Sequence, residues 1–121
     1  MNIKAVDLAP RAEQAESFLK ALANRHRLMV LCELHKGELS VTKLQAAIGL
    51  SQSSLSQHLA RLREDNLVKT RRESQTIFYS LADENVSRVI GLLYDMFCAE
   101  GCGAKSGSRK KPPRVTERKA S

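Results

Sequence analysis

A run of serine and glutamine side chains near the middle of the chain offers hydrogen-bonding chemistry on one surface. Ser53, Ser54, Ser56 and Gln57 are uncharged and short, and their hydroxyl and amide groups both donate and accept hydrogen bonds. Small side chains of this kind let a backbone approach the base edges of a nucleic acid, which an amide can read through paired hydrogen bonds. An ordinary polar surface helix is the alternative interpretation.

The spacing of three leucines predicts that this run lies on the outer side of a helix. Leu55, Leu59 and Leu62 recur at i, i+4 and i+7, which places them on one helical face. At about 100° per residue, Ser53 and Gln57 point roughly opposite that face. We therefore expect the leucines to be buried and the polar side chains to be exposed.

Phosphate-binding groups are predicted beside this polar face. Ser51 is expected to cap the first helical turn, where an open helix N-terminus favours phosphate, and Arg61 lies to one side of the face. Arg71, Arg72 and Gln75 lie near the tip of a predicted hairpin, where they could touch a DNA backbone or minor groove. A hairpin with merely charged ends is the alternative for that segment.

The elements before the polar helix predict a helix-turn-helix. Apolar residues follow helical spacing over residues 11–23 and 24–35, and Asn24 can cap the second of these helices. Ser40 is expected to cap a short helix over residues 41–48. Gly49 then supplies a tight turn. In this motif the second helix, here the polar one, enters the major groove of DNA.

The segment after the polar helix is predicted to form a hairpin and a last helix. Runs of β-branched and apolar side chains over residues 67–72 and 76–81 predict two strands, and Asp83 is expected to cap the helix that follows. Apolar side chains cover roughly 160° of that helix at 100° per residue, which is wider than one core contact requires. Part of this face is expected to meet a second copy of the chain, with burial inside a monomer as the alternative.

Composition and charge limit the class of protein. The 121 residues, 42% of them hydrophobic, suffice for one domain with a modest core. The formal net charge of +7 lies almost wholly in residues 105–121, which hold seven basic groups and one acidic group. The chain has no run of 18 apolar residues and no signal peptide pattern, so we expect a cytoplasmic protein with no membrane partner.

Three regions are expected along the chain. Residues 1–10, which Pro10 is expected to end, are predicted to be a flexible N-terminus. Residues 11–100 are predicted to be the folded domain, and residues 101–121 a disordered basic tail rich in Pro, Ser and Lys. The tail adds either phosphate attraction or solubility, and its residues leave both open. No enzyme is expected, because no nucleophile, base and orienting group recur together and no phosphate-cradling glycine loop is present.

The predicted element order and the run LSQHLARLREDNLV resemble the ArsR family of winged helix-turn-helix repressors, from about Glu13 to Phe97. The resemblance implies a mainly α-helical fold with a small β-hairpin, forming a homodimer through its first and last helices on pseudo-palindromic, double-stranded DNA. In particular the chain resembles metal-independent members that control symbiosis genes in rhizobia, so nodulation genes are among the expected targets. Carried over by position, the resemblance places Ser53, Ser54, Ser56 and Gln57 in the major groove, Ser51 and Arg61 on phosphates, and Arg71, Arg72 and Gln75 in the wing.

The residues at the family's metal sites differ from those of its metal sensors. Metal-sensing relatives carry ELCVCDL where this chain reads ELSVTKL, so Ser40 and Thr42 replace both thiols and Lys43 adds a positive charge. Soft metals need thiolate ligands. Residues 87–97 also lack the histidine that a second metal site of the family uses. We expect neither a bound metal nor a cofactor.

Two cysteines support an alternative function. Cys32 and Cys98 occupy positions where thiol-sensing members of the family place a reactive pair, which keeps open a redox-sensing or persulfide-sensing repressor. The other interpretation is that the thiols are inert, because Cys32 lies among apolar residues and a buried cysteine usually acts as a small hydrophobic residue.

Overall fold

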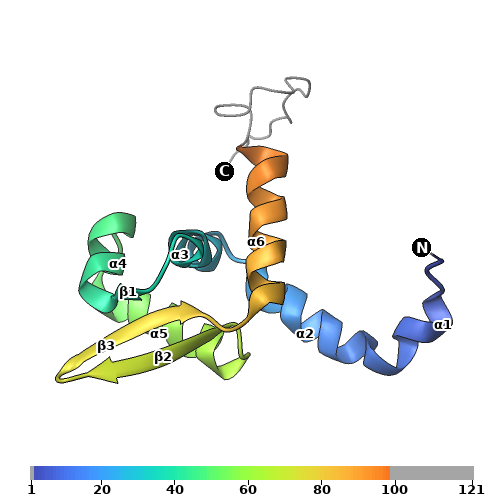
Figure 1. The fold of residues 1–121 in the computed structure, drawn as a ribbon, viewed down its shortest axis with the longest axis horizontal. Helices are drawn as coiled ribbons and strands as arrows, with labels where there is room; N and C mark the ends of the chain where they lie inside the picture. The colour runs from blue at the N-terminus through green and yellow to red at the C-terminus, as the bar shows by residue number, and fades with distance from the viewer. Residues whose placement is uncertain (1, 99–121) are drawn as a thin grey trace.

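The computed structural model describes residues 2–98, and its elements follow the predicted order (Figure 1). The predicted helices correspond to α2 (Ala12–Leu22), α3 (Arg25–His35), α4 (Val41–Ile48), α5 (Gln52–Glu64) and α6 (Glu84–Phe97). The hairpin is formed by β2 (Val68–Glu73) and β3 (Thr76–Leu81). The mainly helical winged fold is therefore confirmed. The predicted basic tail, residues 101–121, lies outside the described residues.

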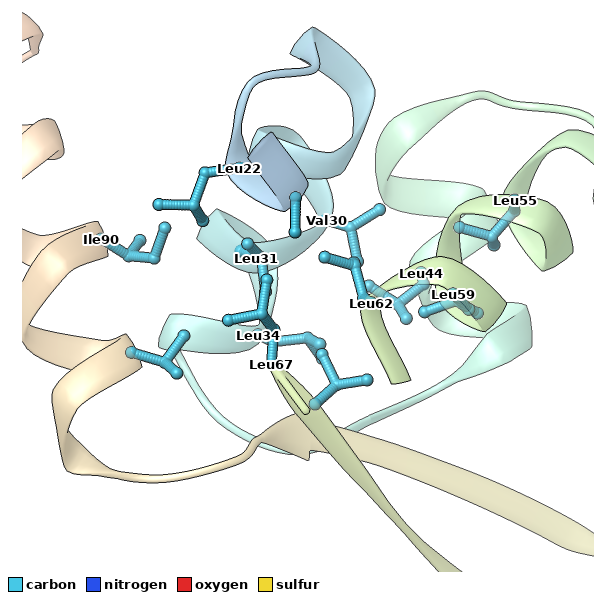
Figure 2. Packing of buried hydrophobic residues seen from close by; sticks show 13 residues of the cluster. Leu22, Val30, Leu31, Leu34, Leu44, Leu55, Leu59, Leu62, Leu67 and Ile90 are labelled. Carbon is cyan, nitrogen blue, oxygen red and sulfur yellow. The ribbon is translucent and has the colours of Figure 1, made fainter. Parts of the chain in front are cut away.

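Leucines from the helix-turn-helix and its neighbours form the core (Figure 2). Leu55 and Leu62 are fully buried and Leu59 is 2% exposed, which confirms the predicted inner face of α5. They pack with Leu31 of α3 and Leu44 of α4, both fully buried. Burial of each such side chain contributes about 1.5–3 kcal/mol, so this contact fixes the orientation of α5.

Side-chain caps set where the helices begin, as the sequence predicts. Asn24 Oδ1 accepts hydrogen bonds from the amides of His26 and Arg27 at 3.0 Å each. Ser40 Oγ accepts from the Lys43 amide at 3.2 Å, and Asp83 Oδ1 from the Val86 amide at 3.1 Å. These caps satisfy amides that have no partner within their own helix. At the other end of α4, Gly49 adopts the left-handed conformation (φ 85°) that ends the helix before α5 begins.

The hairpin belongs to a three-stranded antiparallel sheet of order β1-β3-β2. The additional strand, β1 (Leu39–Ser40), is not predicted from the sequence and pairs with Tyr79 and Phe78 of β3. Two residues are too few to show the alternation by which a strand is recognised. At the tip, Ser74 takes a positive φ of 61° in a two-residue turn, a conformation that glycine adopts more readily.

The N-terminus differs from the prediction that residues 1–10 are flexible. The structure forms α1 (Ala5–Leu8) and the 3-10 turn η1 (Ala9–Arg11), which lead directly into α2. Pro10 was expected to end this segment, but it lies in the first turn of η1, where a proline needs no amide partner. In Figure 1, α1 and α2 extend away from the body as an arm.

Large hydrophobic side chains remain exposed on this arm and on the last helix. Val6 is 71% exposed and Leu19 61%, while on α6 Leu92 and Phe97 are each 58% exposed. No helix within residues 2–98 is long and apolar enough to cross a membrane. The apolar surface is therefore divided between two helical elements that have little to cover them within one protomer.

Candidate nucleic-acid interface

The polar face of α5 is open to solvent. Ser53, Ser56 and Gln57 are exposed, and Ser54 is half-buried at the edge of the face. Because the leucines on the opposite side are buried, the helix cannot rotate without exposing its apolar side. The four side chains predicted to enter a groove are thus brought together on one helix, with their hydroxyl and amide groups directed outward.

Ser51 caps α5 and remains able to donate a hydrogen bond. Its Oγ accepts from the Ser54 amide at 3.1 Å, as the sequence predicts for an N-cap. A hydroxyl that accepts one hydrogen bond still carries a proton to donate. A phosphate at this helix end would therefore meet the Ser51 hydroxyl, together with the first amides of the helix and its positive dipole end.

Arg61 is already paired within its own helix. Its Nε lies 2.6 Å from Asp65 Oδ2, and this hydrogen bond, together with the charge of Asp65, raises the pKa of the Arg61 guanidinium. The Arg61 side chain is 44% exposed, so the pair is solvated and worth little. Arg61 can exchange this carboxylate for a phosphate at small cost.

Arg71 is more firmly held than Arg61. It donates through Nε and Nη2 to the two carboxylate oxygens of Glu38, at 3.0 and 2.9 Å, and through Nη1 to Glu73 at 3.1 Å. Its guanidinium carbon lies 4.7 Å from the centre of the Phe78 ring. These carboxylates raise the pKa of Arg71 far above its usual value. Sequence reasoning missed Glu38 and Phe78 because neither lies near the arginine along the chain.

The other two wing candidates are differently placed. Arg72 and Gln75 are exposed, and the side chain of neither forms a hydrogen bond or ion pair with another of residues 2–98. Arg72 follows Arg71 in β2, so the two side chains point to opposite faces of the sheet. The two adjacent arginines of β2 therefore differ: Arg71 is bound to carboxylates, whereas the Arg72 side chain has no such partner among residues 2–98.

His58 lies behind the polar face, against the start of α3. Its ring is 5.6 Å from the His26 ring, centre to centre, and Arg27 of the same turn donates to the Ala21 carbonyl at 2.7 Å. Burial lowers the pKa of His58, and the nearby charges of Arg27 and His26 lower it further. The neutral imidazole is therefore favoured, and His58 joins α5 to the junction between α2 and α3.

The two predicted thiol residues share one apolar pocket between α3 and α6. Cys32 is half-buried and Cys98 exposed, and both line a cavity of about 260 Å³ together with Leu28, Met29, Ile90, Leu93, Tyr94 and Phe97. The fold therefore brings together two residues that are far apart in the sequence. Among the described residues, no three His, Cys, Asp or Glu side chains converge to form a metal site.

Comparison with known sequences matches the same region. Residues 24–70 fit the family model described as bacterial regulatory protein, arsR family. The transcriptional activator HlyU of Vibrio cholerae is 47% identical over 98 residues, which cover 81% of this chain and 89% of that protein. The nodulation protein NolR of Rhizobium meliloti is 50% identical over 86 residues, covering 71% of this chain and 70% of that protein.

Comparison with solved structures gives the same fold. The transcriptional repressor BigR from Xylella fastidiosa aligns with a TM-score of 0.74 at 40% identity, covering 80% of this chain and 99% of that chain. A homodimeric winged helix-turn-helix DNA-binding domain from Mycobacterium bovis, a possible ArsR-family transcriptional regulator, aligns with a TM-score of 0.70 at 29% identity. That alignment covers 91% of this chain and 99% of the other.

Proposed function

Since the chain belongs to the ArsR family of DNA-binding transcriptional regulators, which are not enzymes, we propose that it is a metal-independent repressor. In this proposal it binds pseudo-palindromic promoter sites as a homodimer. The observation that carries the proposal is the exposed, uncharged polar face of α5, held outward by buried Leu55, Leu59 and Leu62. A groove-reading surface needs this combination of small polar side chains and a fixed helix.

Within this proposal Gln57 reads a base edge, and Ser53, Ser54 and Ser56 line the major groove. Gln57 lies roughly at the centre of the exposed face, and its amide can pair with the donor and acceptor groups of an adenine. Ser51 and Arg61, at the two ends of the face, hold phosphates and fix the register. Arg72 and Gln75 reach from the wing to the DNA backbone or minor groove.

The homodimer is proposed to form through the N-terminal arm and α6. Large exposed apolar side chains lie on or directly beside both elements: Ile3, Val6, Leu8, Leu19, Leu92, Met96 and Phe97. An isolated protomer that left this surface in water would carry an unusually large apolar area. A two-fold dimer would cover it and would present α5 twice, as a palindromic site requires.

Metal independence is supported by what the residues at the family's metal position do. Ser40, which replaces a thiol there, uses its Oγ as the N-cap of α4, and Lys43 contributes the amide that it accepts from. A neutral hydroxyl engaged in a cap is a poor ligand for a soft metal. We propose that occupancy of DNA follows protein concentration or a signal other than a metal.

We propose that the protein lowers transcription and that symbiosis genes are its targets. The similarity to NolR, named a nodulation protein, and to the repressor BigR supports this proposal, although the similar HlyU is named an activator. Measuring transcription from a selected promoter in a purified system would show whether the protein represses or activates. Added protein is expected to reduce transcript from that promoter, and an increase would contradict repression.

Selection of bound duplexes from random DNA tests the proposal directly. At physiological salt we expect enrichment of a pseudo-palindrome of about 20 base pairs, whose half-sites are about one helical turn apart. A protein used only for contacts with other proteins would enrich no sequence. A single unrepeated half-site would contradict the dimeric arrangement.

Arg61→Ala is expected to weaken binding to every DNA sequence by a similar factor. A phosphate contact carries no sequence information, and its loss lowers the slope of log K against log salt by about 0.9. Affinities measured by fluorescence anisotropy at several salt concentrations would give the slope. Lys36→Ala, which removes an exposed lysine just after α3, is the control and should leave the slope unchanged. An unchanged slope in Arg61→Ala would remove its phosphate assignment.

A second candidate function is a thiol-sensing repressor, favoured by the pocket that Cys32 and Cys98 share. If these thiols act as a switch, an oxidant or persulfide donor should release wild-type protein from its selected site, and Cys32→Ser should remain bound. Anisotropy under reducing and oxidising conditions measures this release. Equal binding of both proteins under both conditions would favour inert cysteines and concentration-dependent occupancy.

A further inference from the structure

An arginine of the wing forms an ion pair with the segment that leads into the helix-turn-helix. Arg71 in β2 binds both oxygens of Glu38, a residue 33 positions away that immediately precedes β1. Its third nitrogen binds Glu73, and its guanidinium stacks on Phe78, its cross-strand neighbour. A two-pronged bond between guanidinium and carboxylate fixes orientation as well as distance.

The elements joined by this contact determine where the wing lies relative to α5. β1 ends at Ser40, which caps α4, the first helix of the helix-turn-helix. β1 pairs with β3 over only two residues, Leu39 with Tyr79 and Ser40 with Phe78. Apart from this short ladder, the hairpin is held at its base, where Val68, Tyr79 and Leu81 pack in or against the core. The link between Glu38 and Arg71 therefore adds a restraint nearer the tip.

The geometry also argues against Arg71 as a phosphate contact. All three of its nitrogens donate to carboxylates and one of its faces is covered by a ring, so a phosphate would have to displace several partners at once. Arg72, which points to the other face of the sheet, has no such partners among residues 2–98. The two adjacent arginines therefore have different roles.

We infer that Arg71 is a positioning residue, which with Glu38 holds the wing at the angle needed to meet DNA beside α5. The inference rests on the proposed DNA-binding function. It reassigns Arg71, expected from the sequence to touch DNA, as an internal link, and leaves Arg72 and Gln75 as the wing residues that reach the duplex.

Two neutralising substitutions of matched charge test the link. Glu38→Gln and Glu73→Gln each remove one negative charge that touches Arg71, but only Glu38 joins different parts of the fold. Loss of a negative charge near DNA by itself tightens binding. We therefore expect Glu73→Gln to bind its selected duplex as tightly as wild type or more tightly. Glu38→Gln should bind about three- to fivefold more weakly, the scale of one well-formed exposed ion pair.

Arg71→Gln separates positioning from phosphate binding. Because this substitution removes a positive charge near DNA, we expect a loss at least as large as that of Glu38→Gln, an unchanged salt slope, and no further loss in the double variant Glu38→Gln/Arg71→Gln. If Arg71→Gln lowered the slope by about 0.9 while Glu38→Gln tightened binding, Arg71 would be a phosphate contact and the inference would be overturned. Additive losses in the double variant would overturn it too.

Wing order in the absence of DNA provides an independent measurement. Backbone amide relaxation of 15N-labelled protein should show larger fast motion in residues 69–77 of Glu38→Gln than in wild type or Glu73→Gln, with the signals of α3 and α5 unchanged. Equal order in all three proteins would overturn the link. If wild type bound no duplex at all, the proposed function would fail, and this measurement would still decide the role of Arg71.

Discussion

Leu92→Glu is expected to give a folded monomer whose affinity for its DNA site is at least about a hundredfold weaker, because two linked half-sites bind far more tightly than one. Leu92 is 58% exposed in the protomer, so the substitution removes little from the core. In the proposed dimer the same position is covered by a second copy of the chain. A carboxylate buried there without a partner would oppose association strongly.

Sedimentation equilibrium measures the first part of this result. Wild type should have twice the 13.5 kDa chain mass, and Leu92→Glu should have the single-chain mass with an unchanged helical circular dichroism spectrum. Leu92→Met is the matched control, since it keeps an apolar side chain of similar volume and should remain dimeric. A Leu92→Glu protein that stayed dimeric and bound DNA normally would show that this part of α6 is not the interface.

Gln57→Ala is expected to cost about 1 to 3 kcal/mol per half-site, concentrated at one base pair. The exposed amide of Gln57 is the longest uncharged hydrogen-bonding group near the centre of the α5 face, so its removal should relax the preference for one base. Anisotropy against duplexes that vary that base pair gives the discrimination directly. If the Gln57 amide can rotate to pair with more than one base, the loss of binding free energy should lie at the lower end of this range.

Gln75→Ala is the matched control for this experiment. It removes the same type of side chain from the wing turn, which is proposed to meet the DNA backbone or minor groove and not the major-groove base edge that Gln57 reads. We expect it to weaken all duplexes equally without changing their ranking. If Gln57→Ala behaved in the same way, Gln57 would have no role in reading bases.

The fold could be predicted where the determining interactions are local. The leucine spacing of α5 and the caps at Asn24, Ser40, Ser51 and Asp83 depend on residues within about one or two turns of each other, and the structure confirms them. The N-terminal segment forms helical turns that the sequence does not predict, because Pro10 suggests the end of an element. It begins a helical turn instead, and the surrounding residues alone do not distinguish the two.

The partners of charged side chains were only partly predictable. Asp65 follows Arg61 by four residues, so their pairing along α5 could have been inferred from helical periodicity. Glu38 precedes Arg71 by 33 residues, and its position depends on β1, a strand too short to leave a pattern in the sequence. Whether an arginine is available to DNA thus depends on tertiary contacts that the motif does not contain.

The most direct test of whether α5 reads DNA is an NMR titration of 15N-labelled protein with the selected duplex at physiological salt. It follows the response of the backbone and side-chain amide signals. We predict that the largest changes occur from Ser51 to Arg61 and at the Gln57 side-chain amide. Saturation should occur at one duplex per two chains, with a single set of signals from a symmetric pair. Changes confined to other surfaces, with the α5 signals unmoved, would contradict the claim that this helix reads DNA.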